Sequence, residues 1–104
     1  MAYVERRVFY GKVGLGTPLI EHLRQFKELA GRYGLGWEPR ILSDFNSGRT
    51  DRIVMEAQAD DIQELFPQGP MTSSPEAEQA FSAWNDKLNE LIHYAEVELW
   101  QVQA

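Results

Sequence analysis

The chain opens with the stretch YVERRVFYGKVGLGTP (residues 3–18), which holds a strand pattern, a turn and a helix start in succession. Over residues 3–13, β-branched and aromatic residues mix with charged ones in alternation, as in a strand buried on one side. A glycine-rich turn follows. Thr17 and Pro18 are a typical helix start, because threonine caps free N–H groups and proline suits the first helical turn. We therefore predict a strand, a turn and a helix with Thr17 as its N-cap.

Two segments carry apolar residues at helical spacing. The apolar positions of the first are Leu19, Leu23, Phe26, Ala30 and Tyr33, and those of the second are Ala77, Phe81, Trp84, Leu88 and Leu91. Gly34 or Gly36 is expected to end the first helix. Ser74 and Pro75 repeat the cap-plus-proline start before the second helix.

Three further strands are predicted, over residues 37–45, 52–59 and 94–102. Asn46-Ser47-Gly48 supplies turn residues between the first two of them. Asp61 and Glu64 have the spacing of a capping box and open a short helical turn that ends at Phe66. The loop over residues 67–73 is read as an ordinary exposed connection, with a role as a lid as the alternative.

The order strand, helix, strand, strand, helix, strand predicts an α+β fold, the ferredoxin-like βαββαβ arrangement with a four-stranded antiparallel sheet. Both helices are expected on one face. The first strand–helix–strand unit is expected to cross over right-handedly, which would leave the first and third strands parallel and adjacent at the sheet centre. We expect one domain over residues 1–104, because this length fits a single core.

Composition excludes several classes of function. The net charge of −6 and the sequence pI of about 4.8, without a basic stripe, argue against nucleic acid and anionic membranes as partners. The absence of cysteine excludes disulfides, thiolate metal sites and thiol catalysis. No apolar run approaches membrane-spanning length and no signal peptide is seen, so we expect a cytoplasmic protein.

One face of the sheet is expected to lack helices and to remain rich in large apolar side chains. Alternation places Val4 and Val8 of the first strand under the helices. The dimer-face candidates on the opposite side are Glu5, Arg7, Phe9, Leu42, Val54, Glu56, Glu98 and Trp100. Because an apolar sheet face is costly to leave in water, we expect two copies to pack these faces together as a homodimer.

The first strand resembles a known family in its local motif. Glu5-x-Arg7-x-Phe9 followed by Val13-Gly14 is similar to the Glu-x-Arg-x-Tyr and Pro-Gly of NIPSNAP-like and related small stress-type domains of the dimeric α/β-barrel superfamily. Phe9 lacks the tyrosine hydroxyl, and Val13 replaces the proline. The resemblance implies two sheets packed face to face with helices outside. The superfamily includes cofactor-independent monooxygenases, haem-degrading enzymes and isomerases, so it implies no single reaction.

The ligand-pocket candidates are His22, Phe26 and Trp84. Phe26, Phe81 and Trp84 are first interpreted as core residues, because they have helical spacing, and they become pocket walls only if the helices stand away from the sheet. His93 is expected on a polar face of the second helix, where the helix dipole explains it without a function. With only two histidines, far apart in sequence, we expect no metal and no cofactor. The carboxylates Glu5, Glu56, Glu96 and Glu98 are expected to pair with Arg7, Arg40 and Arg52; sharing a cavity is the alternative.

The sequence is compatible with two functions. The first is a homodimer that binds a small apolar or aromatic molecule. The second is a cofactor-independent monooxygenase or isomerase acting on an aromatic or polyketide-like substrate, with Trp84, His22 or Arg7 polarising an oxygen. An enclosed cavity lined by Phe26 and Trp84 would favour the enzyme, and tight packing of those rings would favour the binding protein.

Overall fold

The computed structural model describes residues 1–33, 38–45, 47–65 and 74–104. Along the chain the elements are β1 (Tyr3–Gly11), α1 (Gly16–Arg32), β2 (Arg40–Ser43), β3 (Arg52–Ala59), the 3₁₀ helix η1 (Ile62–Leu65), α3 (Pro75–Leu91) and β4 (Ile92–Gln101). The predicted βαββαβ order of a ferredoxin-like α+β fold is confirmed.

Some predictions fall outside the described residues: the helix end at Gly34 or Gly36, the strand start at Trp37, Asn46 of the turn, Phe66, and the loop over residues 67–73 with its lid alternative. Among the residues that are described, no helix has the length and apolar character needed to cross a bilayer.

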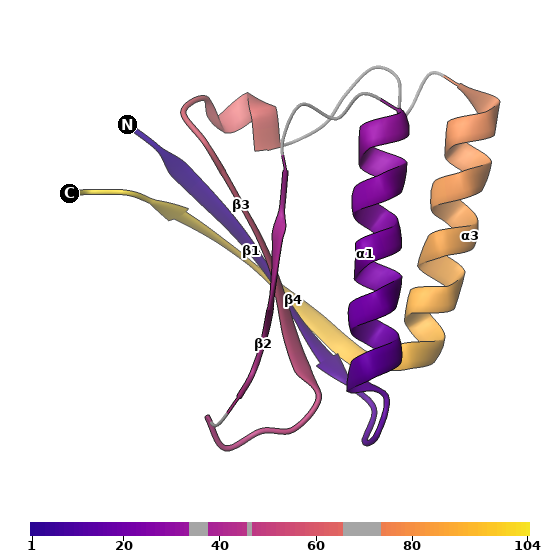
Figure 1. Cartoon of the computed structure of the whole chain (residues 1–104). Helices are drawn as coiled ribbons and strands as arrows, with labels where there is room; N and C mark the ends of the chain where they lie inside the picture. The colour runs from indigo at the N-terminus through magenta and orange to yellow at the C-terminus, as the bar shows by residue number, and fades with distance from the viewer. Residues whose placement is uncertain (34–37, 46, 66–73) are drawn as a thin grey trace.

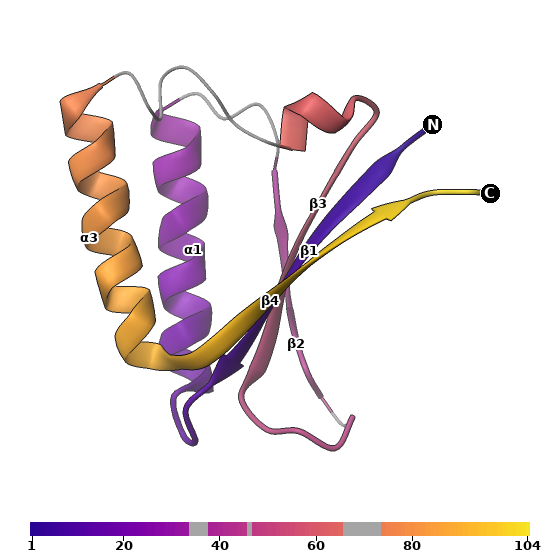
Figure 2. The ribbon, with the colours of Figure 1, turned by 180° about the vertical axis from the view of Figure 1, so that it is seen from behind.

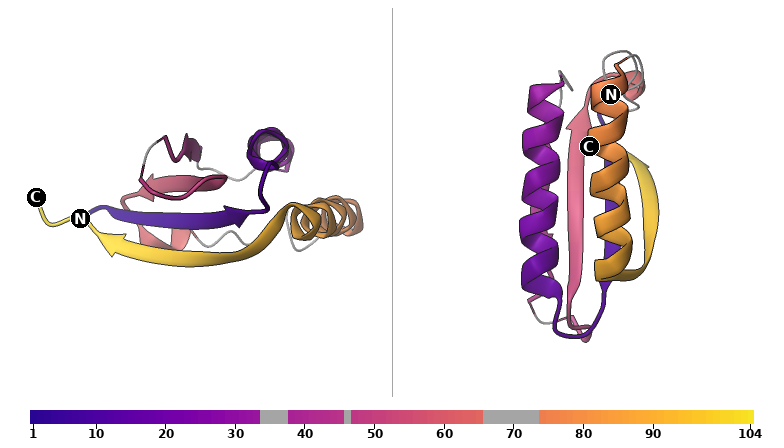
Figure 3. Two further views of the ribbon diagram at one scale, coloured as in Figure 1. Left: turned by 90° about the horizontal axis from the view of Figure 1, so that it is seen from below. Right: turned by 90° about the vertical axis from the view of Figure 1, so that its right-hand side faces the viewer.

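The four strands form one antiparallel sheet in the order β2-β3-β1-β4, and the left view of Figure 3 shows β1 and β4 side by side. The first and third strands are adjacent at the centre, as predicted. Their predicted parallel direction is wrong, because Tyr3 lies opposite Ala59 and Tyr10 lies opposite Arg52. The crossover through α1 leads from β1 to β2, two strands away. β3 then returns by a hairpin and fits between them, so it must run opposite to both.

Both helices lie side by side on one side of the sheet (Figures 1 and 2). The residues of the main core share this helix-facing side of the sheet or the facing stripes of the helices. They are Phe9, Ile53 and Met55 from the sheet with Leu19, Leu23, Leu88 and Leu91 from the helices. Both predicted helical stripes are therefore confirmed. A smaller cluster, Ala57, Ala59 and Leu65, joins β3 to η1.

The predicted faces of β1 are reversed. Phe9 is only 3% exposed and lies in the core, and Arg7 and Glu5, two and four residues earlier, share its side of the strand. Val4 and Val8 instead turn away from the helices. The reason is that β1 carries apolar side chains at both parities, so alternation alone does not say which set is buried. The large ring of Phe9 fills the space between the helices and β3, which decides the orientation.

The start of α1 also differs from the prediction. The helix begins at Gly16, and Thr17 is not its N-cap. The carboxylate of Asp51, from the β2–β3 connection, accepts hydrogen bonds from the N–H groups of Gly14 (3.0 Å) and Gly16 (2.9 Å). A Cβ at Gly16 would lie 2.6 Å from Asp51 Oδ1, so this close approach requires glycine. At α3 the predicted cap is confirmed, since Ser74 Oγ accepts from the Ala77 N–H at 3.3 Å.

We expect Asp51→Ala to lower the midpoint of thermal unfolding by roughly 5 °C, because it removes the cap of α1. The hydrogen bond from Gly14, together with that from Gly16, lowers the pKa of the Asp51 carboxyl despite its partial burial. Because the pKa of Asp51 is lower in the folded than in the unfolded protein, the ionised carboxylate stabilises the fold at pH values above the unfolded pKa. This contribution disappears as the pH falls below about 4. Thermal unfolding of wild type and variant from pH 7 to pH 3 should therefore converge at low pH. Asp60→Ala, at an exposed position, is the control. If the unfolding midpoints of the two variants depend on pH in the same way, Asp51 does not have this role.

Candidate functional site

The open face is the side of the sheet that points away from α1 and α3. Because directly opposed residues on neighbouring strands share a face, its side chains form rows across all four strands. The charged row is Arg40, Glu56, Arg6 and Glu98; the apolar row is Leu42, Val54 and Val8, ending at Glu96; the third row is Asp44, Arg52, Tyr10 and Tyr94.

The charged row is a continuous chain of ion pairs. Arg40 Nη2 lies 2.7 Å from Glu56 Oε1, and Arg6 Nε lies 3.2 Å from Glu56 Oε2. Arg6 Nη1 donates to Glu98 Oε1 at 3.1 Å, and the Trp100 indole donates to the same oxygen at 2.9 Å. Two arginines therefore neutralise two glutamates within one protomer.

The third row contains a second, compact ion pair. Arg52 donates to Asp44 Oδ2 from Nε (2.7 Å) and lies within 2.6 Å of it through Nη2, while the Ser47 N–H donates to Asp44 Oδ1 at 2.9 Å. Burial raises the pKa of the Asp44 carboxyl, but the Ser47 hydrogen bond and Arg52 lower it by more, so the net pKa is lowered. The bond to Asp44 raises the pKa of Arg52. Both groups stay charged at neutral pH.

An aromatic pair completes the third row. The rings of Tyr10 and Tyr94 stack with their centroids 4.3 Å apart, and the guanidinium of Arg49 lies 5.0 Å from the Tyr10 ring centroid. Hydrogen bonding with Glu96 is the main reason why the pKa of the Tyr10 hydroxyl is raised. The phenol therefore keeps its proton at neutral pH and can donate or accept a hydrogen bond.

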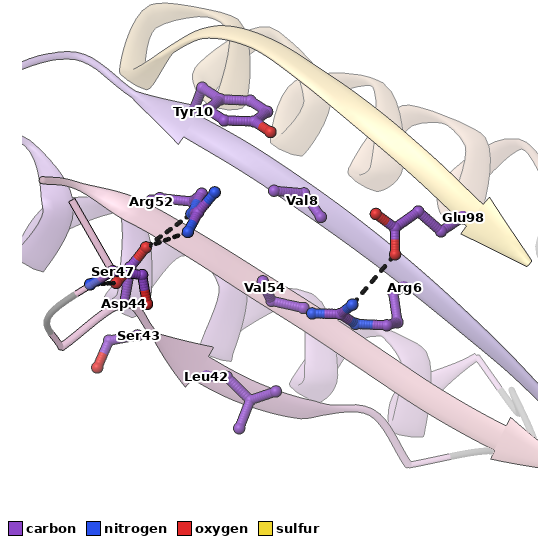
Figure 4. Close-up of a pocket in the computed structure, with 10 residues that line it drawn as sticks. All are labelled: Arg6, Val8, Tyr10, Leu42, Ser43, Asp44, Ser47, Arg52, Val54 and Glu98. Carbon is purple, nitrogen blue, oxygen red and sulfur yellow. Dashed lines mark hydrogen bonds and ion pairs between the residues drawn. The ribbon is translucent and has the colours of Figure 1, made fainter. Parts of the chain in front are cut away.

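A hollow of about 370 Å³ lies on this face (Figure 4). Its floor comes from the apolar row. The lining residues are Arg6, Val8, Tyr10, Leu42, Ser43, Asp44, Ser47, Arg52, Val54 and Glu98. Each of its four charged groups is paired with an opposite charge. An apolar floor with neutralised charges and a phenol at the rim suits a small, uncharged aromatic molecule better than an anion.

The predicted pocket residues His22, Phe26 and Trp84 are brought together, but they pack against one another. His22 Nε2 lies 2.7 Å from the carbonyl oxygen of Trp84, and the Trp84 indole N–H donates to the carbonyl of His22 at 2.8 Å. Since a carbonyl only accepts, Nε2 carries a proton. The two rings stack 4.8 Å apart and almost parallel, and Phe26 lies against Trp84 at 4.9 Å and against Phe81 at 5.8 Å.

These rings join the two helices. A groove of about 390 Å³ runs along the outside of α1 and α3, and His22 and Trp84 line it while Phe26 does not. A ligand-binding role for the three residues stays a prediction.

The dimer-face candidates divide into two groups. Leu42, Val54, Glu56, Glu98 and Trp100 lie on the open face, as expected, whereas Glu5, Arg7 and Phe9 lie on the helix-facing side. Arg7 Nε donates to Glu5 Oε1 at 2.7 Å, and the Glu5 side chain is 8% exposed. The carboxylates of Glu5, Glu56 and Glu98 thus pair with arginines rather than share a cavity.

The hollow contains charged and aromatic residues that were not among the site candidates, including Arg6, Tyr10, Asp44 and Arg52, although Arg52 was expected as an ion-pair partner of a glutamate. A usable signal existed for two of them, because a hairpin centred on residue 48 places Asp44 opposite Arg52. His93 was placed on the second helix, but it lies at the start of β4, which follows α3 without a loop. Within the described ranges, no three metal-ligating side chains gather in one place.

No protein-family model matches the sequence, and no curated protein matches it. Solved structures do match: an uncharacterised NIPSNAP domain protein from Burkholderia xenovorans superposes with a TM-score of 0.72 and 16% identity, over 98% of this chain and 95% of that one. The chain has the fold of the NIPSNAP domain proteins.

Other proteins share this NIPSNAP-type fold. A dimeric ferredoxin-like protein of unknown function from Bacteroides fragilis NCTC 9343 has a TM-score of 0.65 and 13% identity, covering 97% of this chain and 96% of its own. SnoaB, a cofactor-independent oxygenase from Streptomyces nogalater, has a TM-score of 0.68 and 13% identity, covering 99% and 94%. At these identities the likeness concerns the NIPSNAP-type fold and not the activity.

Proposed function

We propose that the protein is a homodimer that packs its two open faces together and holds a small apolar or aromatic molecule between them. The observation that carries this proposal is the open face itself. Its apolar row is uncovered by helices, while its charged row is neutral within each protomer. The charged row and the Asp44–Arg52 pair can leave water as neutral ion pairs, and Glu96 on the same face has the Tyr10 hydroxyl as a hydrogen-bond partner. A protein of similar structure is described as dimeric, which supports the proposal.

The hollow is the proposed ligand site. In a twofold dimer each hollow faces the partner's sheet, so a cavity that is open in one protomer becomes enclosed. Leu42 and Val54 offer an apolar surface to an aromatic ring, and the Tyr10 hydroxyl offers one hydrogen bond at the rim. The ligand class is therefore a small neutral aromatic compound with one polar group. The acidic net charge and the lack of cysteine favour a cytoplasmic protein without nucleic-acid partners.

The oxygenase or isomerase alternative has weaker support. It is favoured by the fold that the chain shares with SnoaB. It needs substrate space beside Trp84, His22 or Arg7. The rings of His22 and Trp84 stack on each other with their N–H groups directed at backbone carbonyls, and the space beside them is a groove on the outer surface of the helices. Arg7 is held by Glu5. The binding protein is therefore the better proposal.

We expect sedimentation and native mass spectrometry to show a dimer at micromolar concentration that binds 1-aminoanthracene, a neutral aromatic fluorophore. Val54→Phe should fill the hollow and weaken this binding at least about tenfold while the dimer persists. Val13→Phe, at an exposed position outside the sheet, is the matched control. If Val54→Phe dissociates the dimer, the same binding measurement is made with Val54→Ile, whose side chain is smaller.

A well-folded lone protomer at micromolar concentration would overturn the dimer. A dimer whose Val54→Phe variant binds the fluorophore as tightly as wild type would overturn the ligand site and leave the dimer standing.

A further inference from the structure

A groove of about 350 Å³ lies between α1 and the outer strand β2, which contact each other (Figure 1). We call it the α1–β2 groove. The residues that line it come from two short segments: Ile20, Arg24 and Lys27 of α1, and Arg40, Ile41 and Ser43 of β2. The three helical residues are four and three positions apart, so they form one stripe along α1. The groove shares only Ser43 with the hollow on the open face.

The base of the α1–β2 groove is apolar. Ile20 and Ile41 are half-buried and pack against the main core, so each keeps part of its side chain at the surface. Ile41 faces the helix side of the sheet, because Met55, directly opposite it on β3, lies in the core. The two branched side chains offer an alkyl chain or a small ring a surface that gains free energy when it is covered.

The rim of the groove is basic. Arg24, Lys27 and Arg40 are three of the ten lysine and arginine residues of the chain, and none of the six lining residues is acidic. The whole chain has a net charge of −6, so the groove is a local exception to the charge of the protein. Cations gathered around a concave surface attract an anion and raise its local concentration.

The three cations differ in how far carboxylates of the protein already neutralise them. Arg40 is held by Glu56, whose Oε1 accepts from Nε at 3.1 Å and from Nη2 at 2.7 Å. Arg24 reaches Glu21 at 3.5 Å, but both side chains are more than 60% exposed, so this ion pair is weak. Lys27 forms no ion pair with any residue that the structure describes. Arg24 and Lys27, one helical turn apart, can therefore bind an external anion together.

The shape and chemistry of the groove select the class of ligand. Its volume is at the lower end of the range for ligand pockets, which suits a small molecule. An inorganic anion would leave the two isoleucines uncovered, and a neutral hydrocarbon would leave the two cations without a partner. A molecule that carries one acid group on an aliphatic chain satisfies both parts, and charged hydrogen bonds to Arg24 and Lys27 would be the stronger polar contacts.

We propose that the α1–β2 groove binds a small amphipathic carboxylate, with its acid group between Arg24 and Lys27 and its aliphatic part on Ile20 and Ile41. This site goes beyond the homodimer and the neutral aromatic ligand proposed above. Every residue that forms it belongs to a single protomer, so it does not depend on self-association. The protein then has two sites of different preference, one for a neutral ligand in the hollow and one for an acid in the groove.

Octanoate is a suitable probe, because it joins a carboxylate to an alkyl chain. Isothermal titration calorimetry of the full-length protein should give a dissociation constant below about 1 mM. Octanamide has a similar chain without the charge and acetate has the charge without the chain, so each should bind at least about tenfold more weakly. The double variant Arg24→Met/Lys27→Met removes both charges and keeps apolar side chains of similar length. It should weaken octanoate binding at least about tenfold.

The matched control is Arg32→Met/Lys87→Met, which removes two cations from the exposed surfaces of α1 and α3 and changes the net charge by the same amount. All four substituted residues are exposed, so both double variants are expected to fold. The control should bind octanoate as wild type does. Equal weakening in the two double variants would overturn the site, because it would show non-specific attraction. Octanamide that binds as tightly as octanoate, or wild type that does not bind octanoate, would also overturn it.

The groove and the earlier proposal can be separated with the same samples. Val54→Phe, which fills the hollow, should leave octanoate binding unchanged. A lone protomer that selects octanoate over octanamide would overturn the homodimer and support the groove. A dimer that binds 1-aminoanthracene but not octanoate would overturn the groove and leave the homodimer and the hollow intact.

Discussion

Replacing Trp84 by alanine is expected to lower the free energy of unfolding by about 3–5 kcal/mol. The indole packs against Phe26 and stacks on His22, and its N–H donates to the His22 carbonyl. Truncation removes all three interactions at once from the junction of α1 and α3. The same ring was a candidate wall of a substrate pocket, so its energetic role also bears on function.

Urea unfolding followed by far-ultraviolet circular dichroism measures this loss without relying on indole fluorescence. Trp84→Phe keeps a ring and removes the N–H donor, so it should cost about 1 kcal/mol. Asn85→Ala, exposed on the same helix, is the control and should change stability by less than 0.5 kcal/mol. A loss below 1 kcal/mol in Trp84→Ala would show that the rings do not pack tightly, and it would favour the oxygenase or isomerase.

Arg6→Met is expected to weaken the self-association of the protein at least about 100-fold. Arg6 links Glu56 to Glu98 across the centre of the open face and is 35% exposed in the single protomer. There the ion pairs are partly hydrated, and their loss should change the fold's stability little. Once two open faces meet, each protomer would bury an excess negative charge. The effect should therefore appear in the dissociation constant and not in protomer unfolding.

The double variant Arg6→Met/Glu98→Gln restores neutrality and should recover most of the association. Arg32→Met, on the exposed end of α1, removes a positive charge elsewhere and is the control. Sedimentation equilibrium at low and moderate salt measures all four proteins. If Arg6→Met associates as tightly as wild type, the charged row is not buried in the dimer.

Much of this fold could be predicted from local patterns. Ser74 followed by Pro75 marked the start of α3, and the alternation over Arg52–Ala59 gave the bounds of β3. The two apolar stripes identified the helical residues of the core. These features depend on hydrogen bonds and side-chain spacing within a few residues of one another, so a short stretch of chain contains the information that determines them.

The features that were predicted wrongly or missed depend on contacts between residues that lie far apart in the sequence. Asp51 caps α1 from more than thirty residues away, and Thr17 carried the stronger local signal. β1 offered apolar residues on both faces, so Phe9 was assigned to the wrong one. The His22–Trp84 pair consists of two predicted residues, yet its packed geometry could not be derived from their separate helices.

The amino-acid sequence by itself determined the elements, their order and the absence of thiol chemistry, because propensity, periodicity and composition are properties of the chain alone. Only the tertiary structure decided which face of β1 is buried and which residues align into the charged row. Those features arise when strands distant in sequence pair in one register, and a shift of one residue would turn every side chain to the other face.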